Sequence, residues 1–166
     1  MSMSEHLPFD ADAFMNQTVD EPMATQLQTV PDGEYTAMIG DFDSTAFKSV
    51  TVTNKTSGLS QDRPVLEIPF IIQDDALKVK LGREQVTHRE TFWLDLNADG
   101  RLDTGADKNV RLGQLRNVLN QNSASAPWAP SMLRNMGPIR IKIVSTTDKR
   151  DPDRKFTNIT RYAKIT

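Results

Sequence analysis

The sequence contains no cysteine and only two histidines, and these absences exclude several kinds of chemistry. Without cysteine there can be no disulfide, thiolate metal site or cysteine nucleophile, which fits a reducing compartment. His6 and His88 are far apart in the chain, and no G-x-S-x-G, H-E-x-x-H, Walker A or G-x-G-x-x-G motif occurs. We therefore expect a protein that is not an enzyme and needs no cofactor or metal. A nuclease-type cluster of carboxylates is the one catalytic alternative.

Long apolar runs are also absent. No stretch approaches the roughly 18 apolar residues that a membrane-spanning helix needs. The first residues lack the basic and apolar regions of a signal peptide. With 166 residues, of which 25% are charged and 37% hydrophobic, the chain is expected to form one soluble domain with a tail.

Basic residues are missing from the first 45 positions. That segment holds nine acidic residues and carries a net charge of −9, whereas residues 46–166 hold all 20 basic and the other 13 acidic residues and carry +7. A basic body behind an acidic leader favours an anionic partner, and nucleic acid is the commonest one. A solvated surface without a partner would show the same charges.

Two segments of different composition divide the chain. Residues 1–30 are polar, acidic and interrupted by Pro8 and Pro22, which predicts a largely flexible N-terminal arm. Asp10 could begin one short amphipathic turn that includes Phe14. Residues 31–166 contain the apolar periodicity of a folded domain.

Five strands and one good helix are predicted in that domain. The strands are expected at Glu34–Ser44, Val65–Ile72, Val86–Leu96, Ile139–Val144 and Lys155–Ile165. Between the third and fourth strands, Leu112, Leu115 and Leu119 recur at helical spacing after a possible N-cap at Asn109. The order β-β-β-α-β-β, with Gly40 allowing the first strand to bend, predicts a mainly β, OB-like five-stranded barrel. Another small barrel or a five-stranded sandwich would show the same order.

The predicted barrel suggests where a ligand would lie. OB-folds bind ligands across strands two and three, between the loop joining strands one and two and the loop joining strands four and five. Here those loops are Phe47–Arg63, with a possible β extension at Val50–Thr53 and a turn near Ser57-Gly58, and Ser145–Arg154. Binding of single-stranded nucleic acid needs cations for phosphates and aromatic rings on which bases stack. The predicted nucleic-acid-binding residues are Lys48, Lys55, Arg63, Arg89, Trp93, Lys142, Lys149, Arg150, Arg154, Phe156 and Tyr162.

Two features weigh against this interpretation. The second loop interleaves its cations with Asp148, Asp151 and Asp153, which dilute its positive field. If the strand parity is inverted, the three aromatic residues Trp93, Phe156 and Tyr162 belong to the core instead.

The segment Asp95–Asp103 resembles the first half of a calcium-binding loop, with oxygen-bearing side chains at alternate positions and a glycine at position six. Position twelve is Ala106 where a bidentate Glu is needed, and a strand is predicted before the loop instead of a helix. An ordinary Asp/Asn/Gly turn is the favoured interpretation.

Five longer segments form a further pattern: PDGEYTAMIGDFD, LKVKLGREQVTHRETFWLDL, GADKNVRLGQLRNVLNQN, SMLRNMGPIRIKIV and FTNITRYAKI. Together they cover about residues 30–166 and resemble a family of small, mostly uncharacterised bacteriophage proteins. Some related small phage proteins are described as single-stranded-DNA-binding or recombination-associated. The resemblance therefore implies a viral protein of the host cytoplasm, but it brings no catalytic or ligand residues.

Together these patterns predict a non-sequence-specific single-stranded DNA-binding protein of phage DNA replication or recombination. The alternative is a non-enzymatic interaction module, either a virion component or an inhibitor of a host enzyme. In both cases the acidic arm could recruit a phage or host protein partner. The sequence leaves the oligomeric state and the choice between DNA and RNA open.

Overall fold

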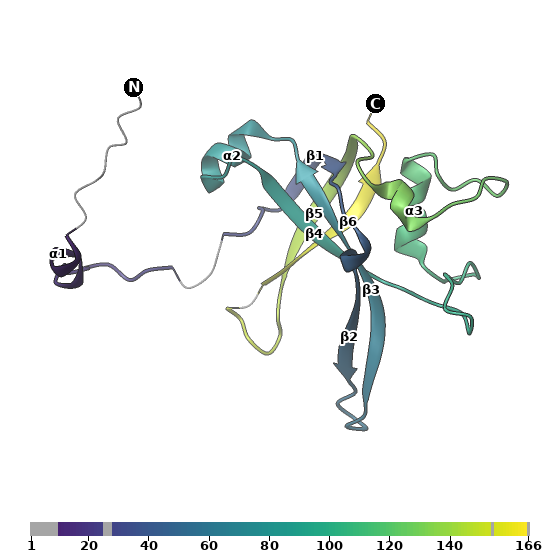
Figure 1. Ribbon diagram of the computed structural model, residues 1–166, viewed down its shortest axis with the longest axis horizontal. Coiled ribbons are helices and arrows are strands. Elements are labelled where there is room, and N and C mark those ends of the chain that lie inside the picture. Colours follow the sequence, from purple (N-terminus) through teal and green to yellow (C-terminus); the bar gives the residue numbers. More distant parts are fainter. Residues whose placement is uncertain (1–9, 25–27, 154, 166) are drawn as a thin grey trace.

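The computed structural model describes residues 10–24, 28–153 and 155–165, and the fold is mainly β (Figure 1). Within these residues one antiparallel sheet contains β1 (Gly33–Ile39), β2 (Phe47–Thr53), β3 (Ser60–Ile72), β4 (Val86–Trp93), β5 (Ile139–Thr147) and β6 (Lys155–Ala163). The helices are α1 (Ala11–Met15), α2 (Asp75–Leu81) and α3 (Val110–Val118), with 3-10 turns η1 (Ser44–Ala46) and η2 (Pro130–Leu133).

The long strand β3 organises the sheet. One of its edges pairs with β4 along Val65–Ile72, and the other pairs first with β2 and then with β1. Gly40 still donates to the Pro69 carbonyl at 2.9 Å, and the chain leaves β3 at residues 41–46. Pro69, which has no N–H to donate, therefore lies where this edge is interrupted. The far edge of β1 pairs with β5, and β5 pairs with β6.

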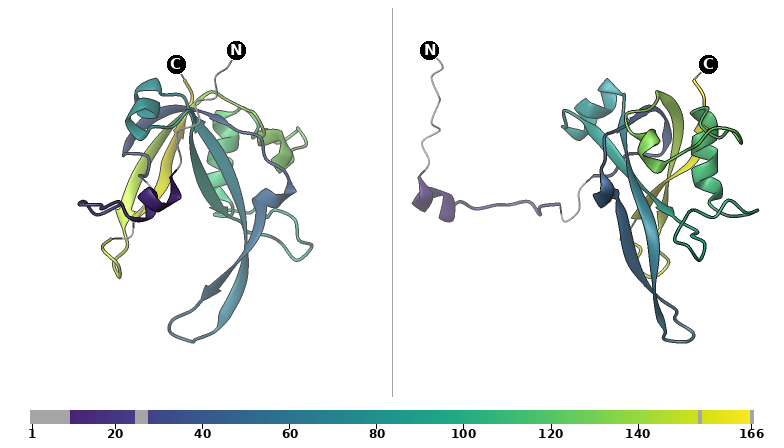
Figure 2. Two further views of the ribbon diagram at one scale, coloured as in Figure 1. Left: turned by 60° about the vertical axis from the view of Figure 1, so that its left-hand side comes forward. Right: turned by 45° about the vertical axis from the view of Figure 1, so that its right-hand side comes forward.

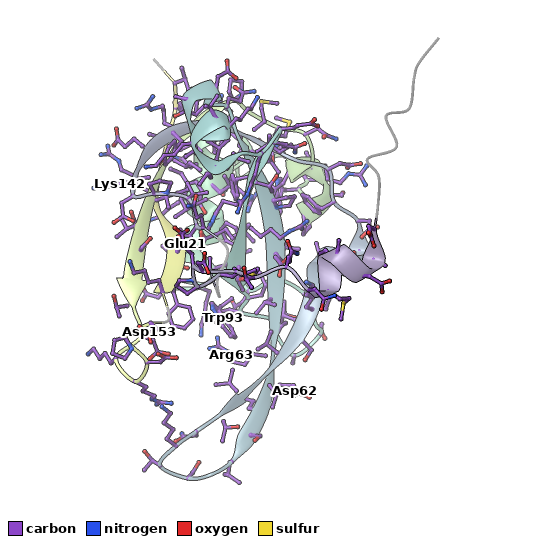
Figure 3. The ribbon with its side chains drawn as sticks, turned by 90° about the vertical axis from the view of Figure 1, so that its left-hand side faces the viewer. Glu21, Asp62, Arg63, Trp93, Lys142 and Asp153 are labelled. Carbon is purple, nitrogen blue, oxygen red and sulfur yellow. The ribbon has the colours of Figure 1, made fainter. Side chains whose placement is uncertain are left out.

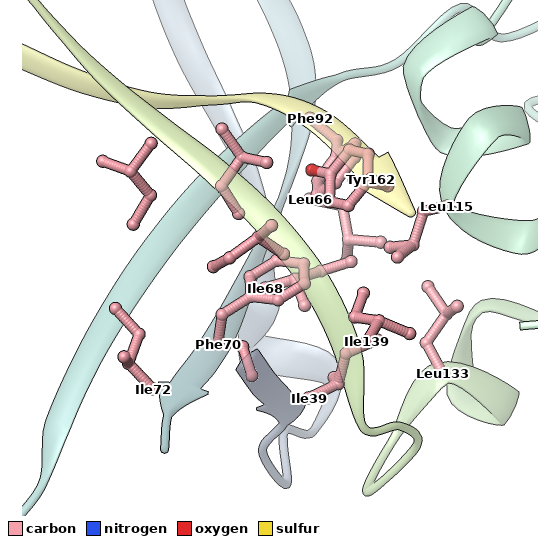
Figure 4. Close-up of a cluster of buried hydrophobic side chains, with 14 of the residues drawn as sticks. Ile39, Leu66, Ile68, Phe70, Ile72, Phe92, Leu115, Leu133, Ile139 and Tyr162 are labelled. Carbon is pink, nitrogen blue, oxygen red and sulfur yellow. The ribbon is translucent and has the colours of Figure 1, made fainter. Parts of the chain in front are cut away.

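The sheet curls around one hydrophobic core without closing by strand pairing. Although β4 and β6 lie at opposite ends of the pairing order, the ring centroids of Phe92 and Tyr162 are 6.2 Å apart. Figure 4 shows side chains from both ends of the sheet in one cluster. The fully buried members include Ile39, Ile68, Phe70, Ile72, Ile141, Ile143 and Ile159. The predicted mainly β class is therefore confirmed, but within the described residues the sheet has six strands instead of five and does not close into a barrel.

Local sequence signals explain the helices. Asp74 caps α2 by accepting from the Leu77 N–H at 3.0 Å, and Gly82, at φ 63°, ends it in the left-handed conformation that glycine adopts without strain. Leu112 and Leu115 bury the inner side of α3 in the core. Asn109 occupies the N-cap position of α3, but its side chain makes no cap hydrogen bond there.

The predicted loop Phe47–Arg63 is a β-hairpin for most of its length, so the possible β extension at Val50–Thr53 and the turn near Ser57-Gly58 are confirmed, but the strands are longer than predicted. Its two halves form β2 and the start of β3, which pair from Phe47–Leu66 to Thr53–Ser60 and leave a turn at residues 54–59. The reason is visible in the sequence only as the alternation of Val50 and Val52 with polar residues, too short a pattern to be distinguished from a polar loop. Figure 2 shows this hairpin projecting well beyond the rest of the sheet.

The N-terminal segment begins with the predicted turn. Asp10 accepts hydrogen bonds from the N–H groups of Asp12 and Ala13, and α1 follows with no buried residue. In Figure 1 this segment extends away from the sheet, and the chain reaches the core at Val30, which is 5% exposed. Across the described residues no helix is both long and apolar enough to cross a membrane.

Candidate functional site

One face of the β2-β3-β4 sheet presents an exposed tryptophan beside an arginine. Trp93 lies opposite Val65 in the β3–β4 pairing, so Arg63, two residues earlier on β3, is its diagonal neighbour. The Arg63 guanidinium carbon is 5.1 Å from the Trp93 ring centroid, and 45% of Trp93 is exposed. Figure 3 shows the two residues together above the β2–β3 hairpin. The outward position of Trp93 and Arg89 agrees with the strand parity, and we call this surface the Trp93 face.

Two further predicted cations lie on the Trp93 face but share an acidic neighbour. Lys48 Nζ is 3.1 Å from Glu67 Oε2, and Arg89 Nη1 is 3.9 Å from Glu67 Oε1. Because one carboxylate lies between two cations, this part of the face keeps a net positive charge smaller than the sequence suggests. Arg63 and Trp93 are therefore the strongest features of the face.

A second cationic group lies on β5 and β6. Lys142 and Arg161 are directly opposite each other in the β5–β6 pairing, and both are exposed. Arg140, two residues before Lys142, pairs with Glu34 at 3.4 Å. Like charges directly opposite in a sheet are destabilising, so the Lys142–Arg161 pair contributes positive field at a cost to the fold. Figure 3 shows Lys142 on the side of the molecule that also carries Trp93.

The remaining predicted residues lie at hairpin tips and on β6. Lys55 is exposed in the β2–β3 turn, and Lys149 and Arg150 are exposed in the β5–β6 turn. Phe156 is 43% exposed and opposite Thr146. Arg154 lies outside the described residues. The two tips point to the same end of the sheet in Figures 1 and 3, with Trp93 and Arg63 nearer the centre.

The outward position expected for Tyr162 is wrong, because this residue belongs to the core. It is 9% exposed, and its ring centroid lies 5.9 Å from that of Phe70 (Figure 4). The pairing of β5 with β6 shifts register between Lys142 and Ile143, so that Thr160 is an extra residue in β6. Since such a bulge reverses the alternation of side chains, Ile159 and Tyr162 both face inward. A bulge of this kind leaves no signal in a short sequence.

Burial has consequences for the Tyr162 hydroxyl. Its Oη is buried and has no hydrogen-bond partner among the residues described. Burial, reinforced by the nearby Glu90 carboxylate, raises the pKa of Tyr162 above its ordinary value. This tyrosine stays neutral and cannot provide a stacking surface for a base.

Sequence reasoning also missed a buried polar cluster between β4, α3 and β6. Glu90 is 1% exposed and its Oε2 lies 3.0 Å from His88 Nε2. The same oxygen accepts from the Ile159 N–H at 2.5 Å, while the Arg111 guanidinium donates to the Ile159 carbonyl and lies 3.9 Å from Glu90 Oε1. The cluster joins the two ends of the open sheet. Polar residues on the inner parity of Val86–Trp93 are the signal that could have revealed it.

The Asp95–Asp103 segment forms a tight turn whose side chains bond to backbone groups. Asn97 Oδ1 accepts from the N–H groups of Asp99 and Arg101, and Asn109 Nδ2 donates to the carbonyls of Asp95 and Asp103. Asn109 thus closes the loop instead of capping α3. In the described part of the chain no group of three or more His, Asp or Glu side chains is arranged to hold a metal ion.

Comparison with known proteins finds no matching family model, no similar curated protein and no similar solved structure.

Proposed function

We propose that the protein binds single-stranded DNA, without strong sequence preference, along the Trp93 face. The observation that carries this proposal is the Arg63–Trp93 pair, an exposed indole and a guanidinium in contact at the centre of a sheet face. Stacking of a base on an aromatic side chain contributes about 1–3 kcal/mol, and cations beside the ring bind the phosphates. A surface built this way holds a strand whatever its base sequence.

The proposal includes an OB-like architecture for the open sheet. In it β1 and β2 together form the bent first strand, and β3, β4, β5 and β6 follow as strands two to five, with α3 between strands three and four. The order β4-β3-β1-β5-β6 fits this assignment, and the contacts of Glu90 with Ile159 replace the strand pairing that would close a barrel. The Trp93 face then corresponds to the surface where OB-folds bind ligands.

Arg63 and Trp93 would act in sequence on an arriving strand. While the guanidinium lies over the ring, it covers one side of the indole. A phosphate attracts the guanidinium more strongly than the ring does, so Arg63 moves to the backbone and the uncovered ring stacks on a base. Lys142 and Arg161 would then contact the strand further along, and the exposed Lys55, Lys149 and Arg150 would contact it near the hairpin tips.

The cellular role follows from this activity as part of the proposal. Non-specific coating of single strands protects intermediates of DNA replication and recombination, which suits the resemblance to small phage proteins acting in the host cytoplasm. The proposed activity is binding alone, without catalysis and without a cofactor.

Fluorescence anisotropy of a labelled oligonucleotide tests the proposal. Titration with the full chain should show saturable binding of a strand of about 30 bases, long enough for more than one site of the size known for OB-folds. The logarithm of the binding constant should fall linearly with the logarithm of the salt concentration, by about 0.7 for each phosphate contacted. A duplex of the same sequence should bind more weakly because its bases are not free to stack. Absence of binding at low salt would reject the proposal and favour a protein-interaction module.

A further inference from the structure

An apolar groove lies on the other side of β2 from the Trp93 face. A groove of about 1090 Å³ opens between β2, α3, the loop of residues 94–104 and the segment of residues 122–134. Its floor is apolar, with Leu66, Leu94 and Leu112 buried, and Phe47, 53% exposed, lines one wall. Phe47 and Lys48 are adjacent on β2 and so point to opposite sides of the strand. The groove therefore lies on the other side of β2 from Lys48, and at its edge Asp43 and Arg134 also border the hollow that contains Lys48, Glu67 and Arg89.

Arginines give the groove a cationic rim. Arg101, Arg116 and Arg134 line it, and Asp43 is its one acidic lining residue; Arg134 also pairs with Asp41, which lies just outside the groove, Nε to Oδ1 at 3.4 Å. The Arg116 guanidinium lies 4.2 Å from the Trp128 ring centroid and donates to the Gln121 carbonyl at 3.0 Å, which fixes both side chains in the wall. An occupant that fits must bring apolar side chains for the floor and negative charge for the rim.

The N-terminal segment Asp10–Val19 of this same chain has that chemistry. It carries Asp10 and Asp12, and no Lys or Arg occurs before residue 46. Its apolar side chains are grouped and exposed, at 56% for Phe14, 77% for Met15 and 57% for Val19. Grouped exposed apolar side chains with charge of one sign are typical of a binding segment.

The direction of the segment favours the groove of another molecule. In Figure 1 and the right-hand view of Figure 2, α1 lies on the side of the sheet away from α3, and the groove is on the α3 side. The groove of a second copy is open to it from solution.

We propose that the acidic Asp10–Val19 segment of one copy docks in the arginine-rimmed groove of a second copy. Two copies that exchange segments reciprocally form a closed two-fold dimer with two equivalent contacts. Because the charges at the rim are exposed, salt weakens the association. The inference does not depend on the proposed DNA binding, since no residue of the Trp93 face takes part.

Sedimentation velocity of the full chain tests the inference. The wild-type protein should shift from monomer to dimer as its concentration rises, and the dimer should dissociate as salt is added. A segment variant, Phe14→Ala with Met15→Ala, and a groove variant, Phe47→Ala with Arg101→Glu, should each remain monomeric at the same concentrations. Met23→Ala, at a residue that is 76% exposed but outside the docking segment, is the matched control and should dimerise like the wild type.

A mixture of the two variants gives the decisive result. The groove variant retains an intact segment and the segment variant an intact groove, so an equimolar mixture should recover a mixed dimer through one of the two contacts. A wild-type chain that stays monomeric, as it would with its segment in its own groove or with only a small ligand there, overturns the inference. So does a dimer that persists in either variant, or a mixture that stays monomeric. Trp93→Ala should dimerise normally, so loss of DNA binding and loss of dimerisation are separable.

Discussion

Glu90 on β4 accepts a hydrogen bond of 2.5 Å from the backbone N–H of Ile159 on β6. In the described part of the chain these two strands do not pair with each other. The Glu90 side chain therefore joins them, as backbone hydrogen bonds join the other neighbouring strands of the sheet. With Arg111 donating to the carbonyl of the same residue, both backbone groups of Ile159 find a partner. The contact thus joins β4 and β6, the two ends of the open sheet.

Glu90→Ala is expected to lower the free energy of unfolding by about 3 kcal/mol, because it leaves the Ile159 N–H buried without an acceptor and removes the carboxylate beside His88 and Arg111. Glu90→Gln retains an acceptor oxygen and should cost less than the alanine variant. Urea denaturation at neutral pH measures both changes. Glu84→Ala, at an exposed position just before β4, serves as the control. Equal midpoints for Glu90→Ala and the wild type would contradict the closing role.

Tyr162→Phe should raise the free energy of unfolding by about 1 kcal/mol, since it removes a buried hydroxyl without a partner and keeps the ring between Phe70 and Phe92. The pKa of Tyr162 is raised in the folded state, so the unfolded chain releases this proton at lower pH than the folded one. The part of the free energy of unfolding that comes from keeping Tyr162 neutral is thus fully present below about pH 10 and is lost as the pH rises further.

Denaturation of the wild type and of Tyr162→Phe between neutral pH and about pH 11 separates the effect of the missing hydroxyl from the effect of its ionisation. The advantage of Tyr162→Phe should be constant at neutral pH and grow in the alkaline range. Tyr35→Phe is a useful comparison, because burial also raises the pKa of Tyr35 but its hydroxyl donates to the Pro31 carbonyl at 2.7 Å. That variant should be destabilised near neutral pH. If the difference in free energy of unfolding between wild type and Tyr162→Phe did not change with pH, the raised pKa of Tyr162 would be contradicted.

The positions of the apolar strands were predictable, but their partners were not. The alternation in Ile139–Ile143 and in Val86–Trp93 reports burial, and both strands begin where predicted, but β4 ends at Trp93 instead of Leu96. Tyr162 was misplaced because one extra residue at Thr160 reverses the alternation. Only Val50–Thr53 of β2 was predicted, as a possible extension, because its side chains are exposed on both sides. The Glu90 cluster depends on three segments meeting in space. A single sequence does not show which distant segments are in contact.

Trp93→Ala should weaken binding of single-stranded DNA by about 1–3 kcal/mol, between roughly 5-fold and 150-fold, through loss of one stacked base. The salt dependence should stay unchanged, since the phosphate contacts remain. Arg63→Ala should instead reduce the slope of that dependence by about 0.7, the value for one phosphate. Anisotropy titrations at several salt concentrations distinguish the two patterns, and Trp128→Phe, in the separate groove, is the control for loss of an indole. Identical affinities of Trp93→Ala and wild type would exclude stacking on this ring.

Arg161→Glu separates binding from stability on the β5–β6 side of the site. Arg161 is directly opposite Lys142, and replacing this like-charged pair with an opposite-charged one should raise the free energy of unfolding by about 0.2–1 kcal/mol. The same change removes one cation and adds an anion where a phosphate is proposed to lie, so affinity for single-stranded DNA should fall and its salt dependence should become less steep. Urea denaturation and anisotropy on the same preparation measure both effects. Arg83→Glu, on the loop after α2, makes the same charge change away from β5 and β6 and should leave affinity nearly unaltered. If Arg161→Glu becomes more stable without losing affinity, the DNA does not contact this pair. If stability rises while affinity falls, DNA binding explains why a destabilising pair of cations is present on this sheet.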